Sequence, residues 1–441
     1  MRHEEKKPVL SEPSPGLSPL PERPISLEGA WKYAFPVLLV LYLVMAIVHA
    51  RTTPMGFTGL QNAPDEQAHY TYILDIAKGH LPTQQSSSAN PTAYEWHQPP
   101  LYYLLSAPFA LSGGVLGVRL FSVFCGAVGL GLIYFTIRRL FPKDGVLPVV
   151  GVGLVALMPS HIALTSTINN DVLLEVCFSA TVCLLVLMLR RGVQSRDALF
   201  LGFCVGAGCL TKATGILLVP VVLFALLLMA KNRESRPSLS RLMGISAAIV
   251  VLLSGWWFVR NGVLYGEVLP LKAFSRAFAG TALAKDFVAE IGWDGYLIHV
   301  GQRSFQSFWA VFGTPKSAER GIQLFLPNVW YGIMVLWAVG VCIGMIRLHF
   351  QRSKLFSKAQ LQSLWVVFLT LGLVFVSFFG FILQYYQAQG RYLYPAMLPI
   401  SIIGAMGWLA LFPNRLRGFG GLVLLGYLAV FSLFYLLVVI P

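Results

Sequence analysis

Charged residues are scarce in this sequence. Asp, Glu, Lys and Arg make up 12% of its 441 residues, whereas soluble domains carry about 25%. Hydrophobic residues make up 56%. Apolar runs of about 17–25 residues, long enough to cross a bilayer, recur along the chain. The shortage of charge therefore excludes an ordinary soluble domain and indicates a polytopic membrane protein.

Segments of alternating polarity are missing as well. A transmembrane barrel needs strands whose side chains alternate between lipid and lumen, and no such pattern recurs. Backbone inside a bilayer must then satisfy its hydrogen bonds within helices. We therefore expect an all-α polytopic membrane protein with about 11 transmembrane helices. The expected spans are residues 33–50, 117–137, 145–162, 171–189, 197–210, 213–230, 242–258, 325–346, 360–383, 392–411 and 419–440.

Cysteine is rare, and its spacing gives no metal or redox motif. All six cysteines fall inside the expected spans, and Cys204 and Cys209 are too far apart for a C-x-x-C pair. We expect small core residues here, not disulfides or metal ligands.

The N-terminal residues lack a continuous apolar core and a small-residue cleavage site, so they do not resemble a signal peptide. Their Pro, Ser and Glu content predicts a disordered cytoplasmic tail over residues 1–31. We expect residues 32–441 to form a single transmembrane domain.

The net charge of +14 would suggest a nucleic-acid partner in a soluble protein. In a membrane protein the distribution of the charge matters first. With a cytoplasmic N-terminus, about two thirds of the Lys and Arg residues fall in inner segments, mostly short loops. We expect a multi-pass protein of the plasma (inner) membrane in this orientation, with no nucleic-acid partner.

Two outer loops are long, at about residues 51–116 and 259–324. Long segments of this kind are usually functional, so we expect the site on the extracytoplasmic side. Phe305, Phe308, Trp309 and Phe312 in the second loop recur at helical spacing, which is typical of aromatic residues at a membrane interface.

The first outer loop predicts two interfacial helices. Asn62 and Pro64 are typical of a helix start. From there His69, Tyr72, Ile73 and Ile76 recur at three- and four-residue spacing until Gly79, which predicts a short amphipathic helix. The apolar segment 97–114 is too short for a span and predicts an interfacial or re-entrant helix.

Ionisable residues gather at the outer ends of the spans, where they are costly and informative. Transporters usually keep their polar site near the bilayer midplane, and little charge falls there. The candidates are Asp65, Glu66, His69, Glu95, His97, Arg119, Asp171, Lys212, Arg260 and Arg391, with Tyr392 beside the last.

Carboxylates and cations in one outer layer suit transfer of a sugar from a lipid phosphate. A carboxylate can accept the proton of the attacking hydroxyl, and Asp65 is the strongest candidate for this base. Glu66 could orient the acceptor or a metal. Arg or Lys side chains can hold the departing phosphate.

Ordinary structural explanations stay open for these residues. Asp65, Glu66 and Asp171 would stabilise a first helical turn in any case. His69 and His97 could be hydrogen-bonded interfacial residues. Lys212 could snorkel, and Arg260 and Tyr392 could anchor the interface.

Seven motifs occur in a recognisable order between about residues 60 and 411. They are PDEQAHY, HQPPLYYLL, VRLFSVFCGAVGLGLIYFTIRRLFP, STINNDVLL, CLTKATGILLVP, WWFVRNGVLYG and QGRYLYPAMLP. Together they resemble the GT-C superfamily of polytopic glycosyltransferases, in particular the bacterial branch of protein mannosyltransferases and aminoarabinose transferases.

This resemblance implies a polyprenyl-phosphate-linked sugar donor and inversion at the sugar. It implies that Asp65 is the base, with Glu66 as its neighbour, and that Lys212 and Arg391 meet the donor phosphate. The acceptor, which could be a lipid, a glycan or a protein, stays open, as does the sugar. Some members use a divalent metal ion, so a metal cofactor also stays open. The main alternative is a transporter or flippase of a lipid-linked glycan, and a non-catalytic scaffold is a third possibility.

Overall fold

The structure is a computed structural model. It describes residues 27–55, 65–90, 92–231, 236–269, 272, 275–276, 282–311 and 325–439. The predicted Asn62 and Pro64 helix start, Phe312 and most of the predicted N-terminal tail lie outside the described residues.

Helices form nearly all of the described structure. The first half of the chain contains α1 (Leu27–Thr52), α2 (Glu66–Ala77), α3 (Gln84–Ala89), η1 (Tyr94–His97), α4 (Leu101–Leu140), α5 (Leu147–Ala156), α6 (Pro159–Thr165), α7 (Asp171–Arg191), α8 (Asp197–Thr211), η2 (Ala213–Leu217) and α9 (Leu218–Met229). The second half contains α10 (Arg236–Val250), η4 (Val251–Gly255), α11 (Trp256–Tyr265), α13 (Ala284–Trp309), α15 (Asn328–Leu355), α16 (Lys358–Ile382), η5 (Gly390–Ala396), α17 (Met397–Ala410), η6 (Asn414–Leu416) and α18 (Arg417–Val439).

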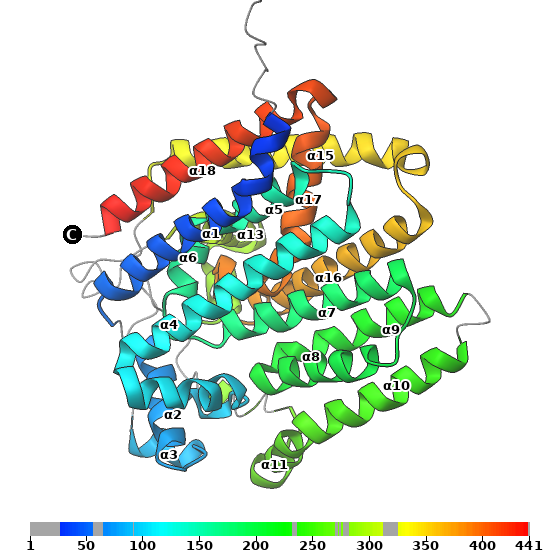
Figure 1. The fold of residues 1–441 in the computed structure, drawn as a ribbon. Helices are drawn as coiled ribbons and strands as arrows, with labels where there is room; N and C mark the ends of the chain where they lie inside the picture. The colour runs from blue at the N-terminus through cyan, green and yellow to red at the C-terminus, as the bar shows by residue number, and fades with distance from the viewer. Residues whose placement is uncertain are drawn as a thin grey trace, which may run out of the picture.

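Every predicted span falls on a helix. Within the described residues, 8 helices are long and apolar enough to cross a membrane, or 9 if the bent pair α5–α6 counts as one span. Helix α8 and the η2–α9 segment are apolar but shorter. The prediction of an all-α polytopic membrane protein is confirmed. Figure 1 shows the long helices α1, α4 and α7 running side by side, with α2 and α3 gathered beyond one end of them.

The segment predicted as one span over 145–162 is bent. Its two parts, α5 and α6, meet at 65°. Pro159 begins α6 and removes a backbone donor, and Met158 before it adopts an extended conformation, as residues before proline prefer. The bend leads the chain into the loop that ends at Asp171.

Helix α4 contains a reversal at Gly114. This glycine has φ of 56°, a left-handed value that favours a residue without a Cβ. Residues on either side of it face each other: the Phe109 and Phe121 rings stack at 5.0 Å, and the Tyr102 hydroxyl lies 2.8 Å from Ser122 Oγ. The first part of α4 is therefore a separate short helix that folds back onto the span. This outcome confirms that the 97–114 segment is not itself a continuous span.

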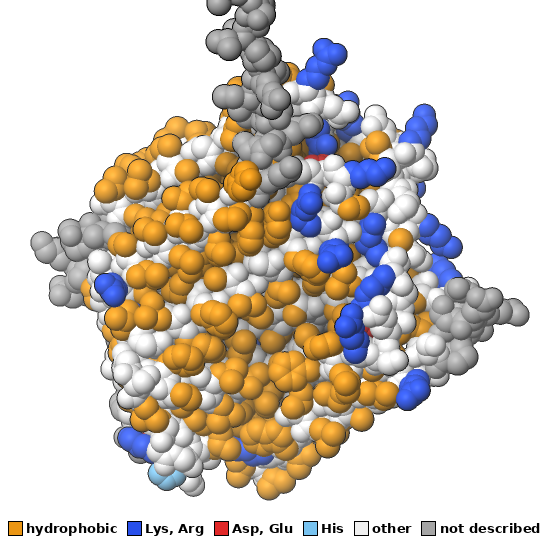
Figure 2. All heavy atoms as spheres, viewed as in Figure 1, with side chains coloured by type: hydrophobic (Ala, Val, Ile, Leu, Met, Phe, Trp, Pro, Cys, Tyr) orange, Lys and Arg blue, Asp and Glu red, His pale blue; other side chains and the backbone are white. Residues whose placement is uncertain are grey.

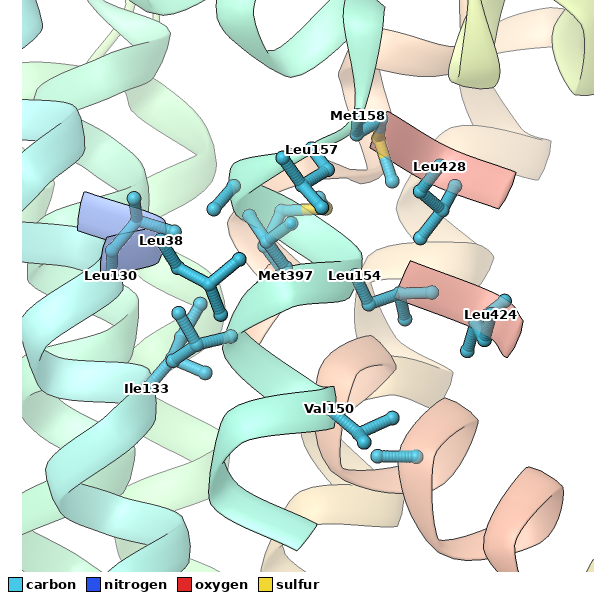
Figure 3. Close-up of a cluster of buried hydrophobic side chains, with 14 of the residues drawn as sticks. Leu38, Leu130, Ile133, Val150, Leu154, Leu157, Met158, Met397, Leu424 and Leu428 are labelled. Atoms are coloured by element: carbon cyan, nitrogen blue, oxygen red, sulfur yellow. The ribbon is translucent and has the colours of Figure 1, made fainter. Parts of the chain in front are cut away.

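Hydrophobic side chains fill the interior and also cover the outside. The largest core cluster joins α1, α4, α5, α17 and α18, and Figure 3 shows Leu38, Leu154 and Leu428 within it. Large apolar side chains such as Leu252 and Phe350 are exposed. Figure 2 shows hydrophobic side chains spread over the middle of one face, with Lys and Arg along one rim. This distribution fits a molecule whose middle region contacts membrane lipid.

The aromatic residues of the second long loop lie on α13. Phe308 and Trp309 are buried, not exposed at a surface. The Phe308 ring packs against Tyr394 at 5.8 Å and Trp309 packs against Trp337 at 5.4 Å. Their helical spacing is confirmed, but it serves the protein core.

Candidate functional site

Asp65 lies immediately before α2 and receives contacts from two distant elements. Its side chain makes no capping bond to α2. Instead Oδ1 accepts a hydrogen bond of 2.9 Å from the Tyr94 hydroxyl, and Oδ2 accepts one of 2.9 Å from Arg391 Nη2. Tyr94 begins η1 and Arg391 lies on η5. The first outer loop and the segment before α17 therefore meet at this carboxylate.

The charges around Asp65 keep it ionised. Burial by itself would raise the pKa of Asp65, but the charge and hydrogen bond of Arg391 and the hydrogen bond of Tyr94 hold that pKa below its usual value. The side chain is 22% exposed, so solvent still reaches it. An ionised, partly accessible carboxylate can accept a proton at neutral pH.

A second ion pair lies close to the first. Lys212 Nζ donates to Asp171 Oδ1 at 2.5 Å. Asp171 begins α7, and Lys212 stands in extended conformation between α8 and η2. Tyr392 links the two pairs, because its ring centroid lies 5.9 Å from Lys212 Nζ and 5.4 Å from the Arg391 guanidinium carbon.

His69 is buried one helical turn after Asp65. Its Nδ1 lies 2.9 Å from the Tyr103 hydroxyl. Burial lowers the pKa of His69 to about 3, although the negative charge of Asp65 opposes this effect. The imidazole is therefore neutral at physiological pH and acts here as a hydrogen-bonding group.

The short helix η1 brings Glu95 and His97 to the same region. Burial and the negative charge of Asp65 raise the pKa of Glu95 to about 8. Glu95 Oε2 is buried and has no hydrogen-bond partner in the described part of the chain. Burial lowers the pKa of His97 to about 4, and its Nδ1 lies 3.1 Å from the Tyr94 carbonyl oxygen. The site therefore combines carboxylates paired with cations, Asp65 and Asp171, with one carboxyl group, Glu95, that is mainly protonated at neutral pH.

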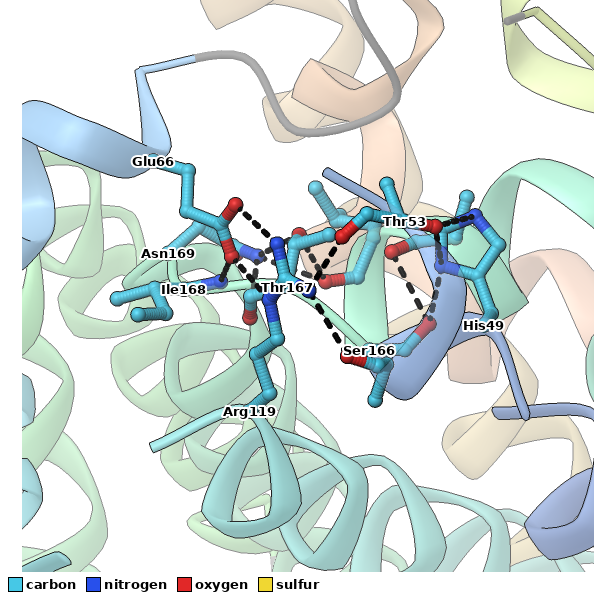
Figure 4. A network of polar contacts seen from close by, with 11 residues as sticks. His49, Thr53, Glu66, Arg119, Ser166, Thr167, Ile168 and Asn169 are labelled. Atoms are coloured by element: carbon cyan, nitrogen blue, oxygen red, sulfur yellow. Dashed lines mark hydrogen bonds and ion pairs between the residues drawn. The ribbon is translucent and has the colours of Figure 1, made fainter. Parts of the chain in front are cut away.

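Glu66 points away from Asp65 into a buried polar network, shown in Figure 4. Arg119 donates from Nε and Nη2 to the two Glu66 oxygens at 2.7 and 2.6 Å. The Ile168 backbone N–H also donates to Glu66 at 3.0 Å. Arg119 Nη1 in turn donates to the carbonyl oxygens of Ala50 and Thr53. Glu66 thus ties α2 to α1, α4 and the loop before α7.

Arg260 lies apart from these two ion pairs. It donates from Nη2 to the Pro82 carbonyl oxygen at 2.9 Å, and its guanidinium lies 4.5 Å from the Trp257 ring centroid. Among the described hydrogen bonds and ion pairs, none joins it to Asp65 or Asp171. The structure brings together Asp65, Asp171, Lys212, Arg391 and Tyr392, with His69, Glu95 and His97 near them.

A metal ion finds no ready set of ligands in the described residues. Among these residues, no group of three or more His, Cys, Asp and Glu side chains lies close enough to hold one. Asp65 and Asp171 face cations instead. We therefore derive no step through a metal.

Two contacts of the site have no signal in the sequence. Tyr94 binds Asp65 and Tyr103 binds His69. Tyr94 adjoins Glu95 in the motif YEWHQPP, but nothing in that motif shows that its hydroxyl reaches residue 65. Aromatic residues are common in membrane proteins, so their hydrogen bonds emerge only from the packing.

Sequence comparison gives one family match. The profile described as dolichyl-phosphate-mannose-protein mannosyltransferase matches residues 97–257. This range includes His97, Asp171 and Lys212. A search of curated proteins finds no match.

Solved structures match over most of the chain. ArnT from Cupriavidus metallidurans bound to undecaprenyl phosphate has a TM-score of 0.52 and 15% identity, covering 91% of this chain and 64% of that one. The Archaeoglobus fulgidus oligosaccharyltransferase in complex with zinc and sulfate has a TM-score of 0.56 and 13% identity, covering 91% and 53%. AglB from Archaeoglobus fulgidus, in complex with an inhibitory peptide and a dolichol-phosphate, has a TM-score of 0.52 and 13% identity, covering 92% and 55%.

The chain therefore spans between 53% and 64% of the length of these proteins. At such low identity the similarity establishes the fold, and function has to be argued from the site. This chain has the same polytopic helical fold as these solved structures. The fold and the mannosyltransferase family match over residues 97–257 fit the resemblance indicated by the ordered motifs.

Proposed function

We propose that the protein is a membrane glycosyltransferase that moves a sugar from a polyprenyl-phosphate-linked donor to an acceptor of the cell envelope. The observation that carries this proposal is the ion pair of Asp65 with Arg391, at 2.9 Å. It places a proton acceptor beside a cation, with Lys212 close by. The fold shared with ArnT bound to undecaprenyl phosphate and AglB in complex with a dolichol-phosphate supports a lipid-phosphate donor.

The reaction is a single displacement on the extracytoplasmic side. The acceptor hydroxyl attacks the anomeric carbon while its proton passes to Asp65. The bond from that carbon to the phosphate oxygen breaks, and its electron pair leaves with the polyprenyl phosphate. Attack opposite the leaving group inverts the configuration. Each Asp65 oxygen accepts one described hydrogen bond and keeps a lone pair for the proton.

The two cations suit the departing phosphate. Arg391 donates from Nη2 to Asp65. Its Nε is buried and has no hydrogen-bond partner among the described residues. Lys212 is 17% exposed and holds Asp171. Charged donors of this kind stabilise the negative charge that grows on phosphate as the bond breaks.

The remaining candidates act through position. Glu66 fixes the start of α2 through Arg119, and so holds Asp65 in place. Asp171 orients Lys212, and His69 contributes a neutral hydrogen-bonding group beside the base. Arg260 lies outside the proposed phosphate site and anchors α11 on the Pro82 carbonyl.

The test is an Asp65→Asn variant. Cells with and without the protein are compared by mass spectrometry of envelope glycans and glycolipids, which reveals the transferred sugar as a missing mass. Transfer is then measured with the purified protein and the corresponding donor. Removal of the base should reduce the rate by about 100-fold or more. Asp75→Asn, the same change on α2, should leave the rate near that of the wild type.

Two results would contradict the proposal. Full transfer by correctly folded Asp65→Asn protein would remove Asp65 from the mechanism. Movement of intact donor across a vesicle membrane, with no free polyprenyl phosphate formed, would favour a flippase.

A further inference from the structure

A basic pocket lies at the end of α4 and α7 far from the candidate site. Its volume is about 600 Å³, and its lining includes Arg138, Arg139, Arg190 and Arg191, with Tyr134 and Phe135 among the apolar walls. None of the described residues that line it is an Asp or Glu. A volume of this size is in the range of small-ligand sites, about 300–1,000 Å³.

The pocket is about one bilayer thickness from the candidate site. Asp171 begins α7 and Arg190 and Arg191 end it. At 1.5 Å per residue this helix is roughly 30 Å long, which matches the hydrocarbon core of a membrane. The pocket therefore belongs to the opposite membrane surface. Figure 2 shows a rim of Lys and Arg side chains next to the broad hydrophobic face.

Three of the four arginines have no carboxylate partner in the described part of the chain. Arg191 pairs with Asp197 at 2.7 Å, and Arg190 donates to the Leu140 carbonyl oxygen. Arg139 instead lies 4.7 Å from the Phe135 ring centroid. The described hydrogen bond of Arg138 is a long one of 3.5 Å to a backbone carbonyl.

The neighbouring acidic residue, Asp144, already has hydrogen-bond and ion-pair partners. The Asp144 carboxylate accepts from Arg417 at 2.8 Å and from the backbone of Val146 and Leu147. The pocket therefore keeps a positive charge above apolar and aromatic walls.

We propose that this pocket binds an anionic phospholipid of the surrounding membrane. The guanidinium groups of Arg138 and Arg139 bind the phosphate of the headgroup, since arginine matches phosphate geometry with paired donors. The acyl chains lie against Tyr134, Phe135 and Leu187. Basic pockets between transmembrane helices are suited to such headgroups. A general excess of basic residues at one membrane surface would explain the arginines. It would not explain why they line a cavity between helices.

The experiment uses the full-length protein purified in a neutral detergent. Dioleoyl phosphatidylglycerol or dioleoyl phosphatidylcholine is added at equal mole fraction, and retained lipid is counted by native mass spectrometry. Wild-type protein should retain phosphatidylglycerol about tenfold more than phosphatidylcholine, because each basic group near the phosphate favours the anionic lipid.

Two variants and a control separate the pocket from a diffuse positive surface. The double variant Arg138→Gln, Arg139→Gln should lose the preference. Leu187→Trp should reduce it without a change of charge, because the indole fills the cavity. The control Arg352→Gln, Lys354→Gln removes the same charge from the exposed last turn of α15 and should keep the preference. Melting temperatures without lipid show that each variant is folded.

Three results would overturn the proposal: no preference in the wild type, equal losses in the pocket double variant and the α15 control, or full retention in folded Leu187→Trp protein.

Discussion

Asp65 combines an uncommon backbone conformation with a side chain that two distant residues hold. Its φ is 61°, and it is the one non-glycine residue with positive φ in the described part of the chain. Asp tolerates this left-handed conformation better than most residues, at a modest energetic cost. Tyr94 and Arg391 hold the carboxylate from outside α2. Tertiary contacts, not helix capping, therefore decide where this carboxylate points.

Glu95 should make stability depend on pH. Its pKa is raised from 4.5 to about 8 in the folded protein, so the folded state holds a proton that the unfolded state releases. The resulting stabilisation is complete below pH 4.5 and is lost as pH rises through about 8. We expect the melting temperature of the wild type to fall between pH 6 and 9, and that of Glu95→Gln to fall less. Thermal unfolding in detergent measures this.

The control for this experiment is Glu290→Gln, which changes an exposed glutamate on α13. It should keep the wild-type slope. A Glu95→Gln protein with the same pH dependence as the wild type would show that Glu95 does not titrate in this range.

Arg119 should be essential for stability. It is buried and forms a two-pronged pair with Glu66, which is fully buried. Arg119→Met would leave the Glu66 carboxylate buried without its cation, and breaking such a pair costs about 3–5 kcal/mol. Chemical unfolding in detergent measures the loss. Arg51→Met makes a change of the same type at an exposed position on α1. Its free energy of unfolding should stay within about 0.5 kcal/mol of the wild type. An equally small effect for Arg119→Met would refute the role of the pair.

At the scale of helices, close packing depends on small residues. Membrane helices approach most closely where glycine removes the side chain. Gly344 on α15 lies against the backbone of Gly407 on α17, so tightly that a Cβ at residue 344 would overlap the Gly407 carbonyl. α17 follows directly from η5, which carries Arg391. The packing of α15 on α17 therefore helps to fix the helix that continues from η5.

Gly344→Ala should destabilise the protein. The added methyl group must push α15 and α17 apart, and overpacking of this kind costs about 1–3 kcal/mol. Gly332→Ala is the matched control on the same helix, because nothing lies within 4 Å of a Cβ there. It should be neutral or stabilising, since alanine favours helix over glycine. The melting temperature in detergent should therefore fall for Gly344→Ala and stay level or rise for Gly332→Ala. A similar fall in both variants would contradict this packing.

At the scale of the whole molecule, charged residues lie at two surfaces, and an apolar region separates these surfaces. One surface holds Asp65, Asp171, Lys212 and Arg391. The other holds the arginines that end α4 and α7. By the positive-inside rule we expect the second surface to face the cytoplasm. On this basis we propose that the candidate site faces the extracytoplasmic side.

This orientation can be tested by thiol labelling in intact cells. A cysteine introduced by Lys78→Cys, exposed just after α2, should react with a membrane-impermeant reagent. A cysteine introduced by Lys354→Cys, exposed at the end of α15, should react only after the cells are permeabilised. The Cys342→Ser background removes the exposed native thiol of α15. The reverse labelling pattern would invert the topology and place the site in the cytoplasm.

The linear order of residues was enough to predict the spans and most residues of the charged layer, although not the separate position of Arg260. Hydrophobic length is a local property, and a bilayer selects segments of one length. Asp65 and Arg391 could be placed in one layer in advance, because ionisable residues at the outer ends of spans are expected at the same membrane surface, but their ion pair was not predicted. The short helix after Pro100 was also predictable, since its apolar run is too short to cross.

Other features arise only when the helices pack together. Asp65 and Glu66 are neighbours in sequence, yet Asp65 contacts Arg391 and Glu66 contacts Arg119. Successive positions at a helix start point in different directions. Only the packing of α2 on α4 decides which partner each side chain contacts. The 65° bend between α5 and α6, the reversal at Gly114 and the separate position of Arg260 depend likewise on contacts between residues far apart in the chain. Hydropathy carries no information about such contacts, since lipid and protein interior are equally apolar.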